Sequence, residues 1–223
     1  MDGGIAVAGR IGPNAITQAA AALDAALPGD AVDALFAEAG LARYRHDPPE
    51  RMVDEREVTA LHRVLRARLP PAQLRALTRE AGLRTGDYLL AHRIPRPVQW
   101  LLRVLPAPLA ARVLLSAIRR HAWTFAGGGA FACAAGHPVR LAIASCPLCR
   151  GARLDHPACD YYAATFERLF ARLVHPRARV TEVACEAMGA AACVFELRWR
   201  DGPAAAARAS ASPPRAPPGA GAP

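Results

Sequence analysis

The spacing of apolar residues changes once along the chain, near Trp123, and this change narrows the folds that the chain can adopt. From about residue 14 to residue 121, apolar residues recur every three or four positions, as in Ile16, Ala20 and Leu23, which is the period of an amphipathic helix. Farther on, apolar and polar residues alternate, most clearly over 192–199, as in strands with one buried face. The sequence therefore predicts an α+β domain, in which a helical N-terminal half packs on a four-stranded, mostly antiparallel sheet.

Capping residues and glycines refine the boundaries of these elements. Asp30 is suited to cap the second helix, and residues 54–57 resemble a capping box before the third. Gly82 and Gly86 lie inside the fourth helix at a cost of ~1 kcal/mol each, which favours close packing of a neighbouring helix over contact with a flat ligand. The remaining expected elements are strands over 123–133, 139–146, 178–184 and 192–199, and a helix over 157–174.

The chain of 223 residues is long enough for one domain with a core of its own. We expect that domain over residues 13–201, with a helical half over 13–121 and a sheet half over 122–201. Residues 1–12 are expected to form a flexible arm. Residues 202–223 consist mainly of Ala, Pro, Ser and Gly, so a disordered tail is expected there.

The formal net charge of +9 says less about function than its size suggests. All 28 basic residues are Arg and Ala is the commonest residue, a bias typical of a GC-rich genome. The Arg residues are scattered without a basic stripe interleaved with aromatic residues, so nucleic-acid binding is the least favoured class. No secretory signal pattern and no uncharged run of 18 residues occur, so we expect a cytoplasmic protein. Neither GxGxxG nor GxxxxGK[ST] occurs, so no nucleotide-binding loop is recognised.

Cysteines carry the clearest chemical signal. A cytoplasmic chain uses them for metal binding, reactivity or packing more than for disulfides. Three thiolates and one carboxylate would fill a closed, structural zinc shell; three core cysteines and a surface Glu are the other interpretation of the spacing. Glu182 and Cys185 have opposite parity in a regular strand, so the strand must turn or bulge near Ala184 for both to reach one ion. The four potential ligands, spaced C-x22-E-x2-C-x7-C, are Cys159, Glu182, Cys185 and Cys193.

A separate C-x-x-C pattern, Cys146-Pro147-Leu148-Cys149, precedes this group. It lacks both a second C-x-x-C and a preceding thioredoxin-like βαβ unit, so an incidental pair in a loop is favoured over a metal half-site or a redox pair. The pair could also contribute ligands to the same ion, which would put Glu182 in doubt. Cys133 is most simply a strand residue.

The segment CDYYAATFERLFARLVHPRARVTEVACEAMGAAACVFELRW, residues 159–199, resembles the 4-vinyl-reductase domain family. This family of small-molecule-binding domains shares its fold with TRAPP-type trafficking subunits and includes the sensing domains of phenol-responsive transcription activators. The resemblance implies a structural zinc on the four ligands above, because those sensors carry the same Cys…Glu-x2-Cys-x7-Cys pattern. Over about residues 10–200, including GPNAITQAAAAL, the chain resembles members of bacteriochlorophyll biosynthesis that are described as 4-vinyl reductases.

The resemblance also implies a ligand pocket between the helical half and the sheet, and a homodimer formed through the helical half. A tetrapyrrole ligand needs an apolar slot, an axial ligand for Mg²⁺ and cations for its propionate. His92 or His121, together with Trp123, could match the His and Trp that hold the ligand in the phenol sensors; an exposed or hydrogen-bonded role is the alternative for each His. The candidate pocket residues are Tyr88, His92, Trp100, His121, Trp123 and Phe125. The candidate cations are Arg93, Arg96, Arg119 and Arg120.

Three functions compete on this basis. The favoured one is a bacteriochlorophyll biosynthesis protein that binds a Mg-porphyrin or chlorophyllide-type tetrapyrrole and carries or presents it to pathway enzymes. The second is a divinyl (proto)chlorophyllide 4-vinyl reductase, which would need NADPH or reduced ferredoxin although no nicotinamide or flavin motif is recognised. The third is a sensor module for a small aromatic ligand, against which the missing output domain argues. The apolar run 98–118 is interpreted as core, pocket wall or membrane-surface element, in that order.

Overall fold

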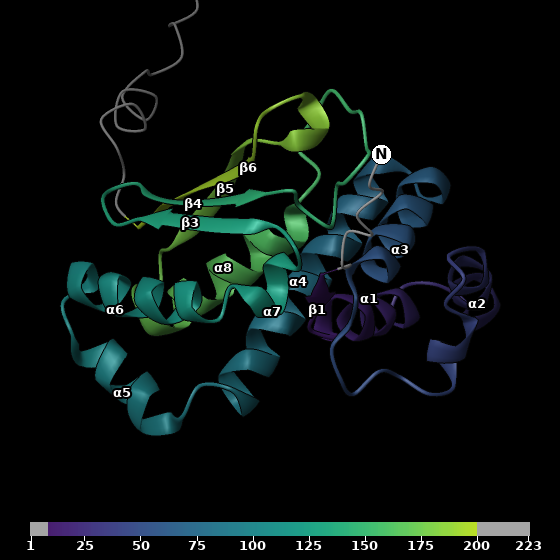
Figure 1. Cartoon of the computed structure of the whole chain (residues 1–223). Coiled ribbons are helices and arrows are strands. Elements are labelled where there is room, and N and C mark those ends of the chain that lie inside the picture. Colours follow the sequence, from purple (N-terminus) through teal and green to yellow (C-terminus); the bar gives the residue numbers. More distant parts are fainter. Residues whose placement is uncertain (1–8, 200–223) are drawn as a thin grey trace, which may run out of the picture.

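The computed structural model describes residues 9–199 and confirms the α+β class (Figure 1). The N-terminal part is helical and the C-terminal part holds an antiparallel sheet. The helical elements are α1 (Asn14–Asp24), α2 (Gly29–Glu38), η1 (Ala42–Arg45), α3 (Glu55–Arg68), α4 (Pro71–His92), α5 (Arg96–Val104), α6 (Ala107–Arg120), α7 (Trp123–Ala126), α8 (Asp160–Leu173) and η2 (Glu186–Met188). The strands are β1 (Arg10–Ile11), β2 (Val53–Asp54), β3 (Ala130–Ala134), β4 (Val139–Ala144), β5 (Arg179–Ala184) and β6 (Cys193–Arg198).

The four-stranded sheet has the order β3-β4-β6-β5, and each neighbouring pair is antiparallel. In Figure 1, α6 and α8 lie against one face of this sheet, whereas α1, α2 and α3 lie farther along α4. The strand that the alternation marks most clearly behaves as predicted. The side chains on its inner face are all buried, namely Cys193, Phe195 and Leu197, with Trp199 directly after the strand.

Helices α4 and α8 pack closely because glycine removes side chains from their contact. A Cβ atom at Gly82 would lie 2.2 Å from the carbonyl oxygen of Tyr161, and one at Gly86 would lie 2.6 Å from the Cβ of Arg168. The hydroxyl of Thr165 donates to the carbonyl oxygen of Gly82 at 3.0 Å, which requires the same close approach. The interpretation of these glycines as a helix-packing surface is therefore confirmed.

The strand expected over 123–133 is wrong in its first half. Residues Trp123–Ala126 form the short helix α7, and the strand β3 begins only at Ala130. Between them, Gly127 adopts a left-handed φ of 61°, which favours glycine. A Cβ at Gly129 would lie 2.3 Å from the carbonyl oxygen of Ala144. The glycine run therefore turns the chain into the sheet, where a continuous strand was expected.

Two smaller expectations at helix and chain ends also need correction. Asp30 lies in the first turn of α2, which begins at Gly29 and has no side-chain cap; a carboxylate there still complements the helix dipole. Of the arm expected over 1–12, residues 1–8 lie outside the described part, but Ile11 is buried and belongs to β1, which pairs with β2. The expected tail over 202–223 lies outside the described residues.

Candidate metal centre and ligand surface

Five of the six cysteines converge in the core at one end of the sheet. Cys146 and Cys149 come from the loop after β4, Cys159 directly precedes α8, Cys185 follows β5, and Cys193 begins β6. All five are buried and none forms a disulfide. Their Sγ atoms are 3.6 Å apart for 146–159, 3.4 Å for 149–193, 3.6 Å for 159–193 and 3.8 Å for 185–193.

These separations suit thiolates that share a metal ion. A tetrahedral zinc with Zn–S bonds of about 2.3 Å holds its sulfur atoms about 3.8 Å apart. Two groups of four have all their ligand atoms within 4.8 Å of one another. One group is the predicted set of Cys159, Glu182, Cys185 and Cys193; the other is Cys146, Cys149, Cys159 and Cys193. The cluster can therefore hold a metal ion.

Glu182 reaches the cluster because β5 is irregular. The pairing of β5 with β6 shifts register between Glu182 and Ala184, so the predicted bulge near Ala184 is confirmed. The Oε2 atom of Glu182 accepts a hydrogen bond from the backbone N–H of Cys159 at 2.8 Å, whereas Oε1 is buried with no hydrogen-bond partner. Burial raises the pKa of this carboxyl to about 8. A buried, unpaired carboxylate oxygen is costly, and a metal ion would satisfy it.

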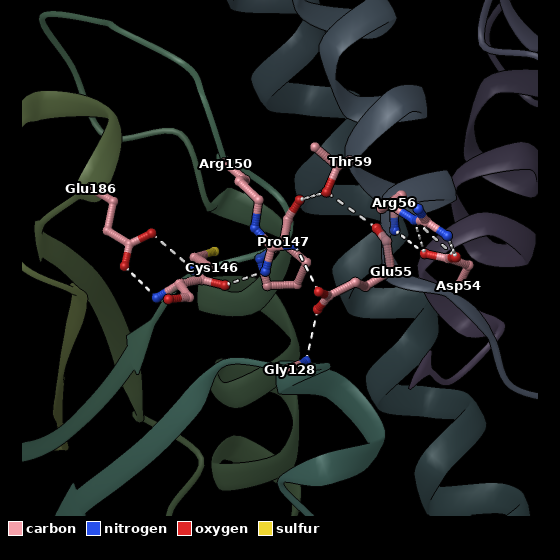
Figure 2. A network of polar contacts seen from close by, with 10 residues as sticks. Asp54, Glu55, Arg56, Thr59, Gly128, Cys146, Pro147, Arg150 and Glu186 are labelled. Atoms are coloured by element: carbon pink, nitrogen blue, oxygen red, sulfur yellow. Dashed lines mark hydrogen bonds and ion pairs between the residues drawn. The ribbon is translucent and has the colours of Figure 1, made fainter. Parts of the chain in front are cut away.

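The C-x-x-C loop, residues 146–149, lies inside this cluster, although the sequence favoured an incidental pair. Figure 2 shows how neighbouring elements hold it. Glu186 of η2 accepts a hydrogen bond from the backbone N–H of Cys146 at 2.9 Å. From α3, the hydroxyl of Thr59 donates to the carbonyl oxygen of Pro147 at 2.7 Å. The antiparallel pairing of β4 with β6, which the sequence does predict, brings this loop to Cys193 and is the signal that could have revealed it.

Two Arg side chains add positive charge beside the cluster. Arg66 of α3 donates to the carbonyl oxygen of Leu148 at 2.7 Å, and Arg150 donates to Glu55 at 2.7 Å. Burial lowers the pKa of the Arg66 guanidinium, and the nearby thiols of Cys149 and its neighbours act in the opposite direction. The site therefore combines an excess of negative ligands with cations held at its edge.

The six predicted pocket residues are dispersed over the surface around α4–α7. Tyr88 and His92 stack at the end of α4 with ring centroids 4.5 Å apart. Trp100 and Trp123 are 66% and 59% exposed, and His121 is also exposed. Phe125 is half-buried in an aromatic cluster with Phe131, Tyr162 and Phe166. Their role in ligand binding stays a prediction.

A cavity of about 510 Å³ lies where the end of α4, α5 and the end of α8 meet. Three cations, Arg96, Arg103 and Arg172, line it together with Asp87 and Gln99. Of the four Arg residues that the sequence suggested for a propionate, Arg96 belongs to this lining.

Helices α5 and α6 bury one side and expose the other. Leu102, Leu114 and Ile118 belong to the core. The exposed apolar residues on these helices, which we call the α5–α6 surface, are Val98, Trp100, Leu101, Val104, Leu109 and Val113. The run 98–118 is therefore only partly the core that the sequence favoured.

The charge around the α5–α6 surface is of one sign. Between residues 88 and 154 the chain has no acidic residue, whereas six Arg fall between residues 93 and 120. None of the helices in the described part combines the length and apolar character that crossing a bilayer requires.

Comparison with known proteins defines the class and then the family. Residues 139–199, which include β4, α8, β5, β6 and all five clustered cysteines, match the 4-vinyl-reductase domain, and this domain defines the class of the protein. Two relatives, each called "Bacteriochlorophyll synthase 23 kDa chain", match most of the chain. The one from Cereibacter sphaeroides is 51% identical over 197 residues, 88% of this chain and 94% of the relative. The one from Rhodobacter capsulatus is 40% identical over 189 residues, 84% of this chain and 86% of the relative. The chain belongs to the family of these 23 kDa chains.

Proposed function

We propose that the protein acts in bacteriochlorophyll biosynthesis, where it binds a Mg-tetrapyrrole intermediate and presents it to pathway enzymes. The observation that carries this proposal is the identity of 51% over 88% of the chain with a relative named for bacteriochlorophyll synthesis. A binding role is favoured over a vinyl reductase because no nicotinamide or flavin motif is recognised in the sequence.

The cavity at the junction of α4, α5 and α8 suits the carboxylate of such a ligand. Arg96, Arg103 and Arg172 converge there, and the planar guanidinium group matches carboxylate geometry. Arg103 is held in place, because it donates to the side-chain oxygen of Gln99 at 3.1 Å and to the carbonyl oxygen of Arg172 at 3.2 Å. Cations oriented in this way support an anion-binding role for the cavity.

The apolar body of a tetrapyrrole could lie on α5 beside this cavity. Trp100 follows Arg96 by four residues and precedes Arg103 by three, so the three residues are neighbours on the helix surface. The exposed ring of Trp100 thereby adjoins two cations of the cavity. His92 lies one residue after Ala91 of the cavity lining and offers an imidazole as an axial ligand for Mg²⁺.

Absorbance titration with Mg-protoporphyrin monomethyl ester tests this proposal. The full chain should show a saturable spectral shift. The variant Arg96→Gln/Arg103→Gln should bind at least about tenfold more weakly, which corresponds to about 1.4 kcal/mol. The matched control, Arg51→Gln/Arg177→Gln, removes two exposed Arg outside this cavity and should bind as the parent does.

Three outcomes would contradict the proposal. Absence of binding by the full chain would overturn it, and equal weakening in both double variants would remove the cavity from it. If a divinyl substrate loses its vinyl absorbance after addition of NADPH, the protein is a reductase and the presenting role is wrong.

The α5–α6 surface supports a second proposal, in which it rests on an anionic membrane surface. Its exposed apolar side chains can enter the interface, and the surrounding Arg residues have no acidic neighbours in sequence to neutralise them. Each Arg near an anionic leaflet contributes about 1 kcal/mol. Charge complementarity therefore favours an anionic bilayer as the occupant of this surface.

Co-sedimentation with vesicles tests this contact. Binding is expected to vesicles that contain phosphatidylglycerol and not to pure phosphatidylcholine. Leu101→Ser should bind about fivefold more weakly, for a loss of about 1 kcal/mol of apolar burial. Met188→Ser is the matched control, because Met188 is 49% exposed and Leu101 is 47% exposed. Equal binding to both kinds of vesicle, or a dimer that Leu101→Ser dissociates in the absence of vesicles, would overturn this proposal; the second result would establish the expected homodimer.

A further inference from the structure

The two groups of metal ligands overlap in a specific way. Cys146 and Cys149 belong only to the first group, whereas Glu182 and Cys185 belong only to the second. Cys159 and Cys193 belong to both. The Sγ atoms of this shared pair lie 3.6 Å apart, between the other donors.

We propose that the cluster holds two zinc ions, with Cys159 and Cys193 as thiolates that bridge them. Cys146 and Cys149 complete the shell of the first ion. Glu182 and Cys185 complete the shell of the second. The inference concerns the metal centre alone and does not depend on whether the protein binds a tetrapyrrole.

A single zinc ion would leave part of the site unused. Structural zinc takes four ligands, but six donors converge here. An ion in the predicted group leaves Cys146 and Cys149 as spare buried thiols. An ion in the four-thiolate group leaves the buried Oε1 atom of Glu182 without a partner.

Two ions use every donor. Together they need eight bonds: each of the four terminal donors supplies one, and each bridging thiolate supplies two. The distances agree on both sides of the shared pair, with 3.4 Å from Cys149 to Cys193 on one side and 3.8 Å from Cys185 to Cys193 on the other. Both shells are then closed, so the centre is structural and has no open position for a substrate.

The charges around the site favour this arrangement. Two Zn²⁺ ions with five thiolates and one carboxylate carry a net charge of minus two. Arg66 and Arg150, which hold the C-x-x-C loop, supply two positive charges beside it. Cys159 directly precedes α8, where the helix dipole favours a thiolate.

Zinc stoichiometry of the full chain tests the proposal directly. Elemental analysis of protein purified without added metal should give two zinc per chain. Cys146→Ser/Cys149→Ser should retain one zinc, and Glu182→Gln/Cys185→Ser should also retain one. The matched control is Cys133→Ser, which removes the one cysteine outside the cluster and should retain two.

Cobalt substitution gives a second measurement that does not depend on the variants folding. Two Co²⁺ ions that share bridging thiolates are magnetically coupled. The EPR signal per cobalt should therefore fall as loading passes one equivalent. One zinc per parent chain, or an EPR signal that grows in proportion to cobalt up to full loading, would overturn the two-ion centre; the double variant that then loses all zinc identifies the single shell.

Discussion

The Oε1 atom of Glu55 and the Nη1 atom of Arg150 lie 2.7 Å apart, which ties the start of α3 to the residue that follows Cys149 (Figure 2). The side chain of Glu55 is only 8% exposed. Its second oxygen accepts a hydrogen bond from the backbone N–H of Gly128 at 2.7 Å. One carboxylate therefore joins α3, the glycine run before β3 and the loop that carries two clustered cysteines.

Replacing this carboxylate should destabilise the fold. Glu55→Gln keeps the shape but removes the charge, so the hydrogen bonds to Arg150 and Gly128 weaken. We expect a loss of about 2 kcal/mol in the free energy of unfolding, measured by urea denaturation. Glu80→Gln breaks an exposed ion pair with Arg84 and should cost less than about 0.5 kcal/mol. Equal losses in the two variants would show that Glu55 has no special part in the fold.

The contribution of Glu55 should depend on pH in a defined direction. Burial acts to raise the pKa of this carboxyl, but the hydrogen bonds from Arg150 and Gly128 outweigh it and hold the pKa below its ordinary value. A carboxyl with a lowered pKa in the folded state stabilises the protein above its unfolded pKa of about 4.3, and this stabilisation is lost as the pH falls through the folded pKa.

The difference in unfolding free energy between the parent and Glu55→Gln should therefore be constant from about pH 7 to about pH 5 and shrink below about pH 4. Urea denaturation at each pH measures it. A difference that stays the same down to about pH 3 would contradict the lowered pKa.

Removing metal should weaken the fold, because the cysteine cluster joins the loop after β4, the start of α8 and the β5–β6 hairpin. The binding energy of a structural zinc is folding energy. We expect a strong chelator to lower the Tm by about 10 °C or more, and zinc in excess of the chelator to restore it. A Tm that does not change when the zinc content falls to zero would show that the centre is not structural.

Periodicity predicted the parts of this site that depend on strand geometry. Alternation placed Cys193 on the buried face of the last strand, and the parity of Glu182 and Cys185 required the bulge that β5 contains. These features follow from local backbone geometry, in which successive side chains of a strand point to opposite faces. They can therefore be derived before any tertiary contact is known.

Features that depend on tertiary packing were missed or only partly predicted. Cys146 and Cys149 enter the cluster through the pairing of β4 with β6, whereas their spacing alone resembled an incidental pair. Trp123 and Phe125 are residue types that favour strands, yet the glycine run after Ala126 lets this segment form α7. Helical periodicity marked α5 and α6 as apolar, but it could not tell which apolar side chains stay exposed.

A methyl group added at Gly82 should separate α4 from α8. The new Cβ would lie 2.2 Å from the carbonyl oxygen of Tyr161 and 2.9 Å from the Cβ of Ala164, so the helices must move apart. We expect Gly82→Ala to lose about 1–3 kcal/mol in urea denaturation, although Ala is the better helix former by ~1 kcal/mol. Gly29→Ala is the matched control, because the first residue of α2 has nothing within 4 Å of an added Cβ and should be neutral or stabilising. If Gly82→Ala is as stable as this control, the close approach of α4 and α8 is wrong.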